Sequence, residues 1–111
     1  MNLEKSKFTN GTGVRFSLKH EDGTEIGRAY LYILYNDLHA EPFGFMEDVY
    51  IHEEFQGQGH GTKIIEALIE EARVRGCYKL IGTSREARPK VHALYEKLGF
   101  TNYGREFRMN F

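Results

Sequence analysis

The chain has 111 residues, enough for one domain with a buried core but too few for two such domains. Its 15 basic and 16 acidic side chains nearly cancel, and 41% of its residues are apolar. This balance excludes a disordered chain, and the lack of a basic excess argues against a nucleic-acid partner. We therefore expect a single domain over residues 1–111 that binds no nucleic acid.

The use of cysteine and of apolar runs bears on the compartment. The single cysteine, Cys77, has no partner for an internal disulfide, which favours a reducing environment. No apolar run approaches the roughly 20 residues of a bilayer span, and segment 1–10 lacks the apolar core of a signal peptide. A cytoplasmic protein without a membrane partner is predicted. Cys77 has no base beside it in sequence and is interpreted as a packing residue, not a nucleophile.

The first half of the chain predicts three strands. Apolar and polar residues alternate over 14–18, and Asp22-Gly23 then marks a tight turn. Segment 25–35 has tyrosine and aliphatic side chains on both faces, so we expect a central strand there. After a polar connection, segment 43–51 predicts the third strand.

In the second half of the chain the spacing of the apolar residues changes. From Gly61 to Ala72 apolar residues recur every three or four positions, which predicts an amphipathic helix with Gly76 as its cap. A short apolar strand at 78–83 follows, and a second helix is expected from Pro89 until Gly99. Beyond it, four apolar residues at strand-like spacing are expected to close the sheet: Tyr103, Phe107, Met109 and Phe111.

The order of these elements predicts an α+β domain with a mixed, mostly antiparallel central sheet and two main helices. The strand–helix–strand unit over 43–83 implies a right-handed parallel crossover, while the preceding strands are antiparallel.

A glycine-rich loop over 56–62 separates the third strand from the first helix. Glycine allows the backbone to approach a ligand closely, and a helix start offers unpaired N–H groups and a positive dipole end. Such a loop suits a pyrophosphate. Both the Walker loop and the dinucleotide fingerprint require a glycine where this chain has Thr62, so neither motif fits.

The positions of Gln56, Gly59 and Gly61 resemble the coenzyme A pyrophosphate motif of the GNAT family of N-acetyltransferases, Gln/Arg-x-x-Gly-x-Gly/Ala. Segment 47–55 resembles the family's preceding strand and turn, and segment 93–100 looks like its second signature, Tyr-x-x-Leu-Gly-Phe. On this combination the chain is identified as a short member of the family, with the acyl-CoA N-acyltransferase fold.

The resemblance implies acetyl-CoA as the acetyl donor. The main chain of 49–51 would pair with the pantetheine arm as an added strand, and the amides of 57–62 would hold the pyrophosphate. Arg88 stands near the place of a family asparagine that contacts the pantetheine; it either pairs with a coenzyme phosphate or is simply exposed. The expected donor-binding residues are Val49, Tyr50, Ile51, Gln56, Gly57, Gln58, Gly59, His60, Gly61, Thr62 and Arg88. No metal site is predicted.

The resemblance also implies catalytic roles. Tyr95 matches the family tyrosine that donates a proton to the coenzyme sulfur, although its place on the helix also suits a core residue. Glu47 is the best candidate base, directly or through a water, with solvated surface charge as the alternative. Strand alternation is expected to send Glu47 and Asp48 to opposite faces. His52 and His92 are secondary candidates for the base.

These features predict an N-acetyltransferase that moves an acetyl group from acetyl-CoA to a primary amine, carried by a small molecule or a peptide, by direct attack in a ternary complex. The alternative is a non-catalytic acyl-CoA-binding or sensing module. Family members usually have one or two helices between the first two strands, whereas only 20–24 intervenes here. With the N-terminal helical region reduced, the acceptor cleft is expected to be open or completed by a second subunit, which favours a homodimer.

Overall fold

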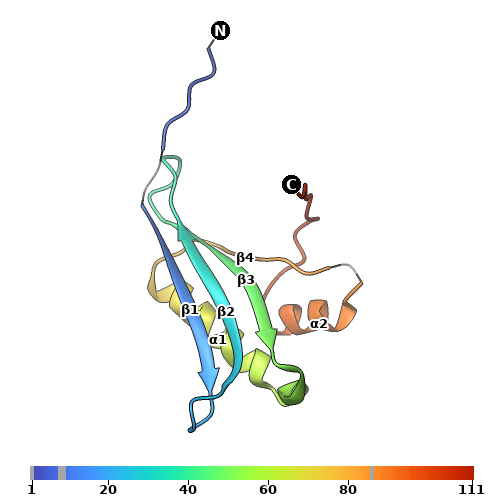
Figure 1. Ribbon diagram of the computed structural model, residues 1–111. Coiled ribbons are helices and arrows are strands. Elements are labelled where there is room, and N and C mark those ends of the chain that lie inside the picture. The colour runs from blue at the N-terminus through green and yellow to red at the C-terminus, as the bar shows by residue number, and fades with distance from the viewer. Residues whose placement is uncertain (1, 8–9, 86) are drawn as a thin grey trace.

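The computed structural model describes residues 2–7, 10–85 and 87–111. Its centre is a four-stranded sheet in the order β1-β2-β3-β4 (Figure 1). The first three strands are antiparallel neighbours, and β4 pairs with β3 in parallel. The strands are β1 (Gly11–Lys19), β2 (Glu25–Leu34), β3 (Phe43–Ile51) and β4 (Leu80–Gly82). The predicted fold class and the central place of β2 are confirmed.

Three helical segments follow β3: η1 (Glu53–Phe55), α1 (His60–Val74) and α2 (Pro89–Lys97). The helix α1 lies across one face of the sheet (Figure 1) and buries Ile64, Ile65, Leu68 and Ala72 against it. Leu31 of β2 and Leu68 of α1 have no exposed surface, so the core lies between α1 and β2. None of the helices in the described part of the chain is long and apolar enough to cross a membrane.

Both α-helices are followed by a glycine with a positive φ angle, as the sequence predicts. After α1, Gly76 has φ 76°, and the Cys77 amide donates to the Ala72 carbonyl over 3.0 Å. After α2, Gly99 has φ 105°, and the Phe100 amide donates to the Tyr95 carbonyl over 3.0 Å. Both are Schellman motifs, which satisfy the last carbonyl groups of a helix.

The outward face of the sheet has no helix over it in the described part of the chain (Figure 1). Between β1 and β2 there is only a turn, at which the Gly23 amide donates to the His20 carbonyl over 3.0 Å. The side chains of Tyr30 and Tyr32 point to this face, because Ala29, Leu31 and Ile33 between them are buried under α1. The open face expected from the short connection is therefore present, and it is rich in tyrosine.

The predicted last strand does not form. Residues 101–111, which we call the tail, have no helix or strand, and the tail ends apart from the sheet (Figure 1). The four apolar side chains of the proposed strand are 76 to 112% exposed. The alternation is compatible with a strand, but a strand also needs a neighbour for its backbone groups, and the tail pairs with none of the described strands.

Candidate acetyl-transfer site

The strands β3 and β4 separate after a short stretch of pairing. Their register joins Gly44 to Leu80 and Met46 to Gly82, and no pair follows Met46 along β3. From Glu47 to Ile51 the side of β3 that faces β4 therefore lacks a strand partner among the described residues. A free strand edge binds an extended, amide-containing chain by main-chain hydrogen bonds.

A bulge on β3 lies at the start of this free edge. Asp48 has φ 51°, the left-handed region that few non-glycine residues adopt, and the pairing with β2 shifts in register between Arg28 and Tyr30. The extra residue of the bulge interrupts the alternation on which the expected opposite placement of Glu47 and Asp48 rests, so that placement stays a prediction. Both residues line the same groove.

The loop before α1 forms as the sequence predicts. Gly57 and Gly59 have φ 77° and 83°, and a side chain at either position would meet open space. No side chain caps α1, and no acidic residue stands in its first turn. An uncapped helix start without a carboxylate presents free N–H groups and a positive dipole end, so the loop fits a pyrophosphate.

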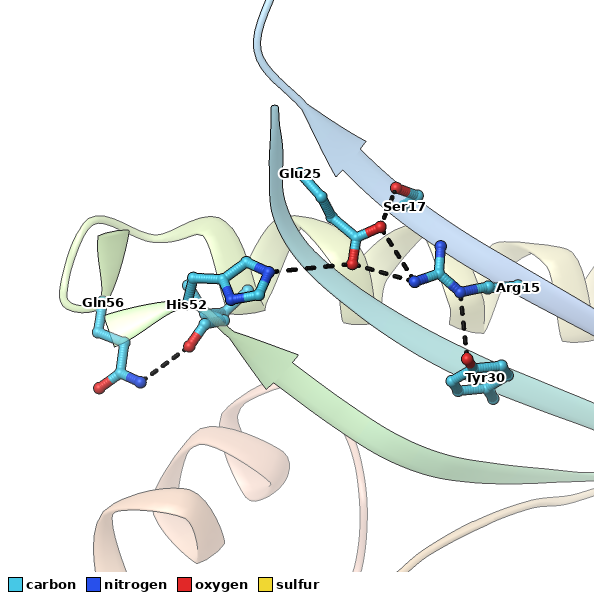
Figure 2. A network of polar contacts seen from close by, with 7 residues as sticks. Arg15, Ser17, Glu25, Tyr30, His52 and Gln56 are labelled. Atoms are coloured by element: carbon cyan, nitrogen blue, oxygen red, sulfur yellow. Dashed lines mark hydrogen bonds and ion pairs between the residues drawn. The ribbon is translucent and has the colours of Figure 1, made fainter. Parts of the chain in front are cut away.

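The side chain of Gln56 contacts the main chain of the neighbouring strand. Its side-chain nitrogen donates to the carbonyl oxygen of Ile51 over 2.8 Å, so the side chain ties the loop to the end of β3 (Figure 2). The structure thus gives Gln56 a contact that fixes the loop next to the free edge.

One groove of about 1370 Å³ joins these features. It runs from Gly61 at the start of α1, past Val49 and Ile51, to Glu47 and Tyr95. Arg88, at the start of α2, also lines it. The other predicted donor-binding residues do not line this groove: Tyr50, Gln56, Gly57, Gln58, Gly59, His60 and Thr62. Tyr50 lies on the outward face under the Arg28 guanidinium, which leaves only its main chain near the free edge.

The hydroxyl of Tyr95 is kept protonated by its surroundings. Burial, and then the charge of Glu47, raise the pKa of Tyr95 above its usual value. Its ring packs against Phe100 with ring centres 5.3 Å apart, the apolar contact that accompanies the Gly99 cap. A protonated hydroxyl on a fixed ring suits a proton donor to a departing thiolate.

The two histidines considered as alternative bases make other contacts. His52 follows the end of β3 and does not line the groove. Its Nε2 points to Glu25 and lies 4.0 Å from the Oε1 atom of that carboxylate (Figure 2). His92 lines the groove, but its Nε2 lies 2.8 Å from the carbonyl oxygen of Arg85. Of the proposed bases, Glu47 lines the groove without a side-chain hydrogen bond to another described residue, and its charge acts on Tyr95.

Several groove residues have no counterpart in the sequence predictions. The hydroxyl of Ser84 is buried without a hydrogen-bond partner in the described part of the chain, a state that a bound ligand would relieve. Arg85 lies near the start of α2, and the tail contributes Arg105, Glu106 and Arg108 to the groove wall. Arg105 and Arg108 are visible in the sequence, but nothing in the pattern of the tail placed them at the groove.

The comparisons with known proteins agree with this geometry. The model of the "Acetyltransferase (GNAT) family" matches residues 3–100, which include the loop, the free edge and Tyr95. The chain belongs to the GNAT acetyltransferase family. The GNAT match stops before the tail.

The names of similar proteins within the family give different acceptor molecules. A glucosamine 6-phosphate N-acetyltransferase of Trypanosoma brucei brucei is 40% identical over 67 residues, 60% of this chain and 44% of that protein. An aminoglycoside N(6')-acetyltransferase type 1 of Stenotrophomonas maltophilia is 31% identical over 96 residues, 84% of this chain and 63% of that protein. A solved Trypanosoma brucei acetyltransferase aligns with TM-score 0.81 and 33% identity, over 89% of this chain and 69% of that one.

This chain matches only part of the length of each of these relatives. The chain spans 33 to 44% of the first curated relatives that it matches. The family and the fold follow from these matches, whereas the acceptor does not.

Proposed function

We propose that the protein is an N-acetyltransferase that moves an acetyl group from acetyl-CoA to a primary amine by direct attack in a ternary complex. One observation carries the proposal: a single groove joins the uncapped start of α1 to Glu47 and Tyr95. The proposed anion site, the free strand edge and the two groups proposed for proton transfer lie along this groove.

The donor is proposed to lie along the groove in an extended form. The amides from Gly57 to Thr62 hold its pyrophosphate, and the main chain from Val49 to Ile51 pairs with its pantetheine arm. Arg88 supplies a positive charge to a phosphate group. This arrangement brings the thioester to the bulge, where β3 changes its pairing.

The reaction needs three things from the chain. An alkylammonium has a pKa near ~10.4, so the amine must lose a proton, which Glu47 accepts directly or through a water. The tetrahedral oxyanion needs a hydrogen-bond donor, and a main-chain N–H near Val49, beside the bulge, supplies it. The departing thiolate needs a proton, and Tyr95 provides it.

The acceptor is proposed to be a small-molecule or peptide amine that arrives over the outward face of the sheet. Glu47 pairs with Tyr30 in the β2–β3 register, so the base lies next to the tyrosines of that face. Named relatives act on glucosamine 6-phosphate, aminoglycosides and thialysine. A homodimer and a cytoplasmic location, both expected from the sequence, complete the proposal.

A non-catalytic acyl-CoA-binding or sensing module is the second candidate. The uncovered sheet face favours it, because nothing in the described part of the chain encloses an acceptor there. Such a module would bind the donor in the same groove without turnover.

The experiment is a calorimetric titration with acetyl-CoA, followed by an assay of thiol release with polyamines, amino sugars, amino acids and lysine peptides. We expect binding, and thiol release with one amine class. Binding without release from any amine would support the sensing module. Absence of binding would refute both candidates and the assignment of the loop.

A further inference from the structure

Arg28 of β2 lies on the outward face of the sheet, where Tyr50 of β3 is its register partner. None of the ion pairs in the described part of the chain includes Arg28. Its guanidinium carbon lies 5.1 Å from the centre of the Tyr50 ring, and that ring meets the His52 ring edge-on with centres 5.3 Å apart. Stacking on an aromatic ring holds a guanidinium in place and leaves the N–H groups in its plane available to a ligand.

The other arginine of this part of the face already has an acidic partner. Arg15 donates to both carboxylate oxygens of Glu25 over 3.0 Å (Figure 2). The same carboxylate accepts a hydrogen bond from the Ser17 hydroxyl over 2.9 Å. The charge of Arg15 is therefore balanced, whereas that of Arg28 is left for a ligand.

The place of Arg28 relative to Glu47 suits one small molecule. Glu47 pairs with Tyr30, two residues beyond Arg28 on β2. Met46, just before Glu47, is buried under α1, so strand alternation turns the Glu47 side chain to the outward face. Diagonal neighbours on one face of a regular strand pair are about 7 to 8 Å apart. One compact molecule can therefore place an amine at Glu47 and an anionic group at Arg28.

Beside these two charged groups the face has an aromatic floor. The rings of Tyr30 and Tyr32 lie nearly parallel, with 7° between their planes and 6.4 Å between their centres. Arg15 Nε donates to the Tyr30 hydroxyl over 3.1 Å, which fixes the first ring (Figure 2). Tyr32 is 40% exposed. Open tyrosine rings offer a rigid apolar surface with a polar end, so a carbon skeleton that joins the amine to the anion can rest on them.

We propose that the acceptor is a small amine that also carries an anionic group, a phosphate or a carboxylate, and that Arg28 binds this group while the amine meets Glu47. The inference rests on the proposed acetyl transfer and names the substrate class of that site. A guanidinium donates two parallel hydrogen bonds to either kind of oxyanion. Contacts at both ends of the acceptor orient its amine toward the thioester, and the positive charge of Arg28 disfavours polycations.

The first test compares matched amines in the thiol-release assay. Glucosamine 6-phosphate against glucosamine tests the phosphate, and lysine against cadaverine tests the carboxylate. We expect the anionic member of at least one pair to have a kcat/KM higher by about 10-fold or more. Arg28→Gln should abolish this preference, and Arg28→Lys, which keeps the charge, should retain part of it. The control Arg73→Gln, on the helix that covers the other face, should leave the preference intact.

The second test measures acceptor binding without turnover. With coenzyme A in the groove no acetyl group can be transferred, and calorimetry gives the Kd of each of the four amines. We expect the same preference of about 10-fold or more for an anionic amine, and its loss in Arg28→Gln. This preference without thiol release would refute acetyl transfer but support the acceptor class. An anionic amine that is preferred in neither measurement, or a preference that survives in Arg28→Gln, would overturn the proposal whether or not thiol is released.

Discussion

Tyr95 packs its ring against Phe100 and is also the proposed proton donor in the groove. The change Tyr95→Phe keeps the ring that packs on Phe100 but removes the hydroxyl whose raised pKa keeps it protonated. If the hydroxyl is the proton donor, kcat should fall by about 100-fold or more, while the Kd of acetyl-CoA stays the same. Single-turnover thiol release and calorimetry measure the two quantities. The control Tyr78→Phe alters a tyrosine outside the groove lining and should keep the parent kcat. An unchanged kcat in Tyr95→Phe would rule out the acid role.

A polar network joins three strand ends at the residue scale (Figure 2). Hydrogen bonds from Ser17 and Arg15 lower the pKa of Glu25, so the folded state favours the carboxylate. Because the folded-state pKa is the lower one, this contribution to stability is present above the unfolded-state pKa and is lost as the pH falls through the folded-state value. We expect Glu25→Gln to lower the Tm at pH 7, and the difference from the parent protein to vanish at acidic pH once the Glu25 carboxylate is protonated. The exposed Glu21→Gln serves as the control, and an equal loss at both pH values would contradict the linkage.

At the scale of elements, the cap of α2 holds the catalytic candidate in place. Gly99 has φ 105°, which alanine adopts only with strain, whereas Gly104 has an ordinary φ and open space around it. The change Gly99→Ala should lower the free energy of unfolding by about 1 to 2 kcal/mol, and Gly104→Ala should change it by less. Urea denaturation of both variants measures this difference. Equal effects would mean that the cap conformation is not what stabilises the end of α2.

The elements differ in how well the sequence predicts them. The helices are predicted to within a residue or two, because periodicity, Pro89 and two glycine caps all act within a few positions of the chain. The bulge at Asp48 was not predicted, since aspartate in a strand carries no local signal for a positive φ. The tail was predicted as a strand of its own sheet and is not, because alternation shows how a segment would pair but not with which edge.

The residues of the candidate site also differ in how well the sequence predicts them. The loop and Tyr95 stand in short motifs whose residues are neighbours in sequence, so their approximate places were predictable. The buried hydroxyl of Ser84 and the tail charges reach the groove only through the three-dimensional fold. Which face receives the acceptor depends on the register of β3, which composition does not determine.

For the whole molecule, stability rests on the single layer between α1 and the sheet. Leu68 has no exposed surface, whereas Val74, at the end of the same helix, is 74% exposed. The change Leu68→Ala removes buried methyl groups and leaves a cavity, which should cost about 2 to 5 kcal/mol of unfolding free energy. For Val74→Ala we expect less than about 0.5 kcal/mol. Denaturant titration of the pair measures both values, and similar losses would place the core elsewhere.

The helix α2 has a weaker hold on this layer than α1. As far as the structure describes the chain, α2 has no fully buried side chain and packs through the half-buried Leu94, Tyr95 and Leu98. Local opening of such an element costs less free energy than unfolding of the molecule. In hydrogen–deuterium exchange, the amides of α2 should therefore exchange well before those of β2 and α1. A donor that bridges the loop and α2 should slow the exchange of α2 selectively, so that one wall of the groove becomes rigid only when the groove is filled.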